Sequence, residues 1–144
     1  MQNVQSAVEA IYRDTPCTGH TSIEVWELDL ANYQSVLTFG ELVRTQLPRL
    51  DAFIANAGME LQKYKKAEDL EIQLTVNVVS TFLGAIVVLP KLQETARRYD
   101  VQTSLIFCGS TYHIFGPDDE FYVGLPEDKG MFEELSDPAR TDIT

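Results

Sequence analysis

Small and polar residues that could meet a ligand follow three short apolar runs of the sequence: Asp29, Asn56-Ala57-Gly58 and Gly109-Ser110. If these runs are parallel strands, their carboxyl ends open onto one edge of a sheet, where such folds bind ligands. A small residue and a Gly let the backbone approach a ligand closely, and Asn can offer its amide to a sugar or a ring. The pattern therefore predicts a ligand crevice at that edge.

Each of these residues also has a simple structural interpretation. Asn-Ala-Gly taken alone is most often a tight turn, and Asp29 can be merely an acid at a strand end. Ser110 can cap a turn, and no Gly-x-Ser-x-Gly elbow surrounds it, so it is not predicted to be a hydrolase nucleophile. Asn77 shares a helical face with apolar and small residues and can be a polar core residue.

The elements that must position these residues alternate between helix and strand. Apolar residues at helical spacing predict helices near residues 4–11, 36–47 and 68–98. The last helix is expected to kink or restart at Pro90. Short apolar runs predict strands at 23–30, 51–55 and 104–108. This alternation indicates an α/β fold, with a partial Rossmann-like parallel sheet of about three strands and flanking helices over residues 1–115.

The composition changes after residue 115. Residues 116–144 contain nine acidic and two basic residues, which supply −7 of the net charge of −11. Gly and Pro punctuate this stretch and no apolar period continues through it, so an acidic irregular loop or tail is predicted.

Composition and charge narrow the classes of function. With 144 residues, 44% of them hydrophobic and 23% charged, the chain has the balance of one soluble globular domain. A net charge of −11 argues against a nucleic-acid partner and disfavours anionic membrane surfaces. Cys17, Cys108, His20 and His113 lack the short spacings of a metal site, and no metal is predicted.

The location of the protein is expected to be cytoplasmic, because the start of the sequence resembles no secretory signal and the two cysteines form no disulfide framework. Residues 72–90 carry no charge and are long enough to cross a membrane. Their Gln, Thr, Asn, Ser and Pro residues favour a helix buried in protein instead.

Four landmarks in order resemble the short-chain dehydrogenase/reductase family, over residues 1 to about 115: Leu28-Asp29-Leu30, Leu50-Asp51 with Asn56-Ala57-Gly58, Val76-Asn77 and Leu105–Ser110. They are similar to the family's adenine-side Asp, its Asn-Ala-Gly strand, its catalytic Asn and its catalytic Ser. His113 and Leu89-Pro90-Lys91-Leu92 resemble the retinol-dehydrogenase-like branch.

The resemblance implies an oxidoreductase that interconverts an alcohol and a carbonyl of a small molecule with NADP or NAD, NADP being the preference of that branch. Asp29, Asn56, Ala57 and Gly58 would border the cofactor. Asn77 would belong to a proton relay, and the hydroxyl of Ser110 would bind and stabilise the substrate oxygen.

The sequence departs from the family pattern at both ends. It contains no Gly-rich turn for the cofactor pyrophosphate, and no Tyr is followed four residues later by Lys. A truncated enzyme is therefore expected, and an inactive interaction protein or truncated gene product, pairing with itself or with a complete family member, stays open. Without its neighbouring strands, segment 23–30 is expected to sit in a gapped or rearranged sheet.

Overall fold

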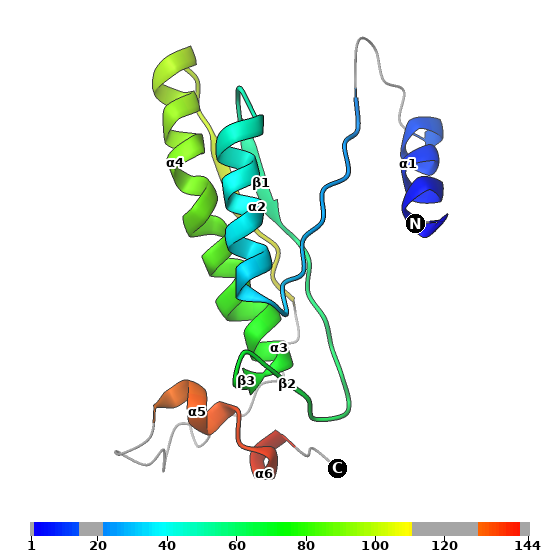
Figure 1. Ribbon diagram of the computed structural model, residues 1–144, viewed down its shortest axis with the longest axis vertical. Coiled ribbons are helices and arrows are strands. Elements are labelled where there is room, and N and C mark those ends of the chain that lie inside the picture. The colour runs from blue at the N-terminus through cyan, green and yellow to red at the C-terminus, as the bar shows by residue number, and fades with distance from the viewer. Residues whose placement is uncertain (1, 15–21, 111–129, 142–144) are drawn as a thin grey trace.

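The computed structural model describes residues 2–14, 22–110 and 130–141. Its helices and strands follow the chain in this order: α1 (Gln2–Asp14), α2 (Tyr33–Gln46), β1 (Ala52–Ala55), β2 (Lys66–Ala67), β3 (Leu70–Glu71), α3 (Ile72–Leu74), the π-helical segment η1 (Thr75–Ser80), α4 (Thr81–Tyr99), β4 (Ser104–Phe107), α5 (Met131–Leu135) and α6 (Pro138–Thr141). Figure 1 shows α2 and α4 side by side against β1, with α1 standing apart. The predicted α/β class is confirmed.

The sheet that organises the fold contains two parallel strands. β1 pairs with β4 in the register Ala52 with Ser104 through Ala55 with Phe107. The connection between them runs through α3, η1 and α4, because parallel neighbours need a long crossover. Both strands lie where the short apolar runs predicted them.

The core lies between α2 and α4. Val43, Val88 and Leu92 form its centre, and Trp26, Phe39 and Phe53 pack against it. The helices approach closely at Gly40, where a Cβ would lie 2.6 Å from the Cβ of Val87. Asn32 begins α2, since its side chain accepts a hydrogen bond from the Ser35 N–H.

The β4 strand is exposed at all four of its residues. Ile54 on β1 is also 58% exposed, and Ile86 on α4 is 65% exposed. Part of the apolar surface of β1, β4 and α4 is therefore not covered by any other described part of the chain.

The segment 22–30 forms no strand, which differs from the sequence prediction. It is extended but joins no ladder, so the main sheet of the described chain has two strands and not about three. Some of its backbone N–H groups bind side chains instead: Ile23 donates to Tyr12 Oη and Asp29 donates to Ser35 Oγ. The physical reason is that an extended segment becomes a strand only beside a partner backbone.

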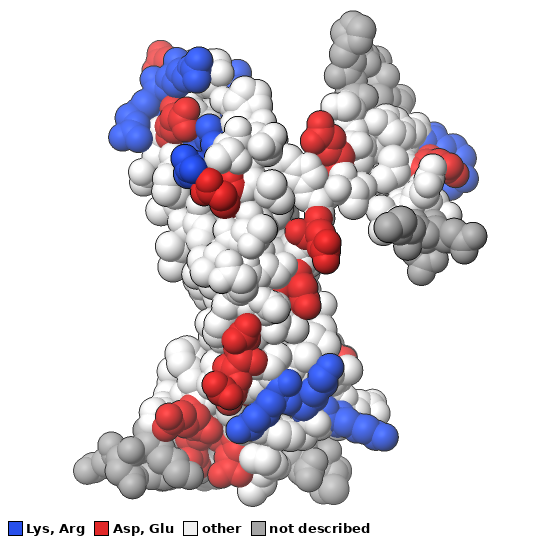
Figure 2. Space-filling model, in the orientation of Figure 1, with Lys and Arg blue, Asp and Glu red and all other residues white. Residues whose placement is uncertain are grey.

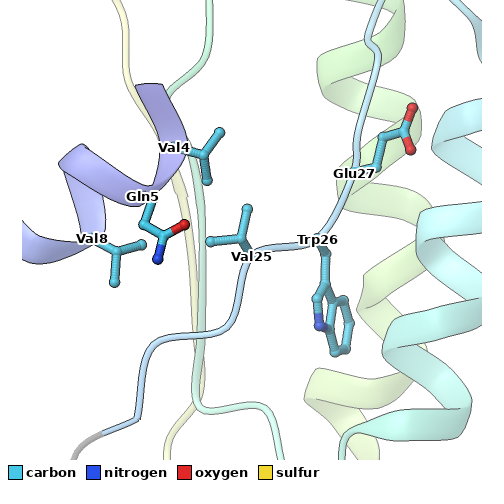
Figure 3. Close-up of a pocket in the computed structure, with 6 residues that line it drawn as sticks. All are labelled: Val4, Gln5, Val8, Val25, Trp26 and Glu27. Atoms are coloured by element: carbon cyan, nitrogen blue, oxygen red, sulfur yellow. The ribbon is translucent and has the colours of Figure 1, made fainter. Parts of the chain in front are cut away.

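Two cavities separate this segment from its neighbours. One of about 500 Å³ lies between residues 22–28 and the apolar side chains of α2 and β1. Another of about 700 Å³ lies between α1 and residues 25–27, with Val4 and Val8 facing Val25 (Figure 3). The ring of Trp26 bridges to α2, meeting Phe39 edge-on at 6.2 Å between centroids. The segment is therefore held by side chains rather than by a ladder.

The long helical run extends from Ile72 to Tyr99. It begins after residue 68, where the prediction began it, and its irregular winding does not lie at Pro90, where a kink or restart was predicted. A β2–β3 hairpin precedes it, with Glu68 and Asp69 at positive φ in the turn. The side chain of Glu71 then caps the run by accepting hydrogen bonds from the N–H groups of residues 73 and 74. The run continues as helix through Pro90, and its change of winding falls at η1 instead.

The same helical run is long and apolar enough to cross a membrane by length and composition. In this structure it packs on α2 and β1, burying Ala85, Val88 and Leu92. This packing agrees with the buried core helix that the polar residues of the run favoured.

Part of the acidic segment that was expected to be irregular forms the two short helices α5 and α6. Ser136, only 4% exposed, fastens them to the hairpin. Its Oγ accepts from the Glu71 N–H at 2.9 Å, and its carbonyl accepts from Tyr64 Oη at 2.7 Å. Local composition could not reveal these distant partners.

Candidate functional site

The carboxyl ends of β1 and β4 meet at one edge of the sheet. Because the strands are parallel and paired at Ala55 and Phe107, the residues that follow them leave the sheet together. The Cys108 N–H donates to the Ala55 carbonyl at 3.0 Å and extends the pairing by one step. Asn56, Ala57 and Gly58 therefore lie beside Gly109 and Ser110.

A cavity of about 430 Å³ opens at this edge, lined by Ala55, Asn56, Ala57, Gly58, Met59, Asn77, Thr81, Cys108, Gly109 and Ser110. Its volume falls within the range of small-molecule sites. Five of the six predicted site residues line it: Asn56, Ala57, Gly58, Asn77 and Ser110. The fold thus brings together predicted site residues that are up to 54 positions apart in the sequence.

Asp29 is the predicted site residue that does not line this cavity. Its carboxylate accepts from the Ala31 N–H at 2.9 Å, which shapes the turn before α2. Its neighbours Leu28 and Leu30 line an adjoining cavity of about 240 Å³, which shares Asn56 and Ala57 with the first. His113 lies outside the described residues.

The amide of Asn77 is already engaged by the chain itself. Its Oδ1 accepts from the Met59 N–H and its Nδ2 donates to the Met59 carbonyl, both at 2.8 Å. A Cβ at Gly58 would come within 3.3 Å of that Oδ1, tighter than a comfortable contact. The side chain of Asn77 therefore shapes the loop after Gly58, and the absence of a side chain at Gly58 makes room for it.

The η1 segment places Asn77 and leaves polar groups near the cavities. Thr81 Oγ1 donates to the Val76 carbonyl at 2.9 Å, satisfying a group in the altered winding. Ser80 Oγ is buried and finds no hydrogen-bond partner among the described residues, and Ser80 borders the smaller cavity. A buried hydroxyl beside an open cavity suits a ligand with polar groups.

Ion pairs of the scaffold lie at the opposite end of the strands. Hydrogen bonds from Arg49 lower the pKa of Asp51, just before β1, and a hydrogen bond from Lys91 lowers the pKa of Glu94. Figure 2 shows Lys and Arg side chains gathered where α2 and α4 end, and the last turns of these helices contain Arg44, Arg97 and Arg98. Apart from Lys91 these charged side chains are largely exposed, and they lie away from the cavity.

Sequence reasoning missed three contributors to the site. Met59 and Thr81 line the cavity, and Gln73 holds the loop that contains Met59. Gln73 and Thr81 are spaced four residues before and after Asn77, so one helical face carries all three. That spacing was a visible signal.

Comparison with known proteins identifies the family. A sequence model described as "short chain dehydrogenase" matches residues 1–112. A short chain dehydrogenase/reductase, dmxR8, of Cryptosporiopsis sp. (strain 8999) is 48% identical over 99 residues, which are 69% of this chain and 30% of the relative. The short-chain dehydrogenase/reductase phmF of Phaeosphaeria nodorum is 31% identical over 145 residues, covering 100% of this chain and 41% of the relative.

A third relative, the short-chain dehydrogenase anuD of Penicillium roqueforti, is 39% identical over 117 residues, covering 80% of this chain and 28% of the relative. The chain therefore spans less than half the length of these relatives. It belongs to the short-chain dehydrogenase/reductase family, as its ordered landmarks predicted. Members of this family generally bind NAD or NADP, which is compatible with the polar and small residues at the two cavities.

Proposed function

We propose that this chain forms part of the cofactor and substrate site of an oxidoreductase that interconverts an alcohol and a carbonyl by hydride transfer. The observation that carries the proposal is the meeting of Asn56–Gly58, Asn77 and Gly109–Ser110 around one cavity. If Asn56–Gly58 and Gly109–Ser110 were only turns, each segment would be explained by itself. That interpretation gives no reason for the segments to share one cavity of about 430 Å³. Membership of the family supplies the reaction class.

The cofactor we propose is NADP, with NAD as the alternative. The cofactor would be held at the cavity of about 430 Å³ by Asn56, Ala57 and Gly58. Asp29 would act from the neighbouring turn, beside Leu28 and Leu30. The small side chains permit close approach to the backbone. When bound, the nicotinamide supplies or accepts the hydride.

Ser110 would bind the substrate. Its side chain is exposed at the end of β4 and lines the cavity. A hydroxyl placed there can donate a hydrogen bond to the substrate oxygen and stabilise charge that develops on it. Asn77 would act by positioning, because both ends of its amide are bound to Met59.

A second copy, or a complete family member, is the protein partner that we propose. Apolar side chains remain exposed on α4 and β4, including Phe82 and Phe107, whose rings lie 5.0 Å apart. Such a surface commonly marks a site of association.

Calorimetric titration of the 144-residue chain with NADPH and with NADP tests the proposed function. We expect saturable binding near about one equivalent. Gly58→Val should abolish it, because the new side chain presses on Asn77 and enters the cavity. Gly130→Ala is a control away from the cavity, since its Cβ meets only ordinary contacts at 3.8 Å or more and Gly130 is the N-cap residue of α5.

Two results would contradict the proposal. One is the absence of heat from a folded wild-type sample, and the other is unchanged binding by Gly58→Val. If binding is found, a substrate screen with an active family member as partner should show that Ser110→Ala lowers turnover by about 10²–10³-fold while cofactor affinity is retained.

A further inference from the structure

We infer that Gln73 is a second positioning residue of the proposed site, which it serves by holding the loop after Gly58 against the start of the helical run. Gln73 does not line the cavity of about 430 Å³ at the ends of β1 and β4. It reaches Leu61, two residues beyond the cavity-lining Met59. The inference rests on the proposed function only for its effect on the cofactor.

The contacts of Gln73 repeat those of Asn77. Gln73 Oε1 accepts from the Leu61 N–H and its Nε2 donates to the Leu61 carbonyl, both at 3.2 Å. Asn77 makes the same pair of contacts with Met59 at 2.8 Å. A side-chain amide offers the same donor and acceptor as a peptide group, so the two amides do the work of a neighbouring strand for this loop.

The order of the two pairs gives the direction of the loop. Gln73, in α3, binds Leu61, and Asn77, four residues later in η1, binds Met59. The loop therefore runs antiparallel to the helical run, and each side-chain amide binds the N–H and the C=O of one residue and skips residue 60 between them.

The effect on the cavity is transmitted through the loop. Residues 59–61 belong to no helix or strand and join no ladder, so these amides supply ordering that a sheet would otherwise give. If the two hydrogen bonds between Gln73 and Leu61 break, only the Asn77 amide still holds the loop, at Met59. The loop can then rotate about that contact. The wall formed by Gly58 and Met59 then loses its fixed shape.

Amide hydrogen exchange measured by NMR on the 144-residue chain tests the inference. Gln73→Met keeps the length of the side chain and removes both hydrogen bonds. We expect exchange at the amides of Leu61 and Met59 to become about five- to tenfold faster, as the loss of hydrogen bonds of ordinary strength predicts. Gln93→Met is the matched control, because Gln93 is exposed on α4, and it should change neither amide.

A milder variant guards against a general loss of folding. Gln73→Glu keeps an oxygen that can accept from the Leu61 N–H, so the exchange of Leu61 should stay within about twofold of wild type. The amide of Val88, in the core, reports whether the fold is intact in each variant. Unchanged exchange at Leu61 in Gln73→Met would overturn the inference, as would faster exchange at Leu61 alone with Met59 unaffected.

Cofactor titration separates this inference from the proposed function. Gln73→Met should weaken NADPH binding by about fivefold, while Gln93→Met should leave it unchanged. Equal affinity in both variants would overturn a role for Gln73 at the site. A folded wild-type chain that binds no cofactor would instead refute the proposed function, and the exchange rates of Leu61 and Met59 would still decide whether Gln73 positions the loop.

Discussion

Replacement of Gly40 by Ala should destabilise the protein, although Ala normally favours a helix. A Cβ at position 40 would lie 2.6 Å from both the Cβ and one Cγ of Val87. The Cβ of Val87 is fixed to its own backbone, so α2 and α4 must separate. Such overpacking costs about 1–3 kcal/mol, and the helix propensity of Ala returns about 1 kcal/mol. The expected net loss in the free energy of unfolding is about 0–2 kcal/mol.

Gly84 provides a matched control in the same pair of helices. A Cβ there would meet Phe53 at 3.8 Å and Val36 at 4.0 Å, which are ordinary contacts. Gly84→Ala should therefore raise the free energy of unfolding by about 0.5–1 kcal/mol, since only the change in propensity remains. In urea followed by circular dichroism, the two midpoints should differ by about 1 M.

The reasoning is refuted if Gly40→Ala unfolds at the same urea concentration as Gly84→Ala or at a higher one. Adding Val87→Ala to Gly40→Ala refines the test. This second change removes the Cγ atoms but keeps the Cβ that lies 2.6 Å away. It should consequently recover only part of the lost stability.

Two further predictions concern the end of the fold opposite the cavity. Thr95, 1% exposed, accepts the Leu50 N–H on its Oγ1 at 2.9 Å, so Thr95→Val should cost about 1–3 kcal/mol in urea unfolding, and Thr95→Ser less because it keeps the hydroxyl. Arg49→Met should raise the pKa of Asp51 towards its ordinary value in an NMR titration, because the hydrogen bonds from Arg49 hold that pKa down. A carboxyl with a lowered folded pKa contributes stability above its unfolded pKa and loses it as the pH falls through the folded value, so this variant should lose the acid-side part of that dependence. An unchanged Asp51 titration would contradict the assignment.

The sequence predicted the two strands that pair in the main sheet, and its prediction of a third strand at 23–30 was wrong. Residues 51–55 and 104–108 contain the strands because β1 packs on α4 and β4 pairs with β1, so each strand backbone has a partner. Segment 23–30 has the same apolar character, but pairing requires a neighbour, and neither β1 nor β4 takes that place. Apolar character is local, whereas a ladder is a property of two segments.

The irregular features of the long helix were also beyond the sequence pattern. The β2–β3 turn uses Glu68 and Asp69 at positive φ, where neither Gly nor Asn announces it. The π-helical winding at Thr75–Ser80 changes no apolar spacing strongly enough to be seen. Pro90 predicted a kink or a restart of the helix, and the helix does not restart there but continues through it. Tertiary packing against α2 and β1 outweighs the local preference at this position.

The candidate site was predicted as a set of positions and not as a set of contacts. Asn56, Gly58 and Ser110 were found because residues at the ends of parallel strands must leave a sheet at the same edge. The roles of Asn77 and Ser110 in catalysis remain predictions, as does the retinol-dehydrogenase-like branch. Asp29 was grouped with them by the same strand-end argument, but segment 22–30 joins no sheet, and the Asp29 carboxylate lies in the neighbouring turn before α2.

The sequence by itself determined the α/β class, the family and the residues that face the edge of the sheet. Apolar periodicity and the residue types that follow a strand depend only on residues close together in the sequence. Only the tertiary structure decided that Asn77 binds Met59, that Gln73 binds Leu61 and that Ser136 fastens the acidic segment. Each of these contacts joins residues 12 to 65 positions apart. Hydrogen bonds of this kind depend on the distance and direction between two backbones, and those exist only once the chain has folded.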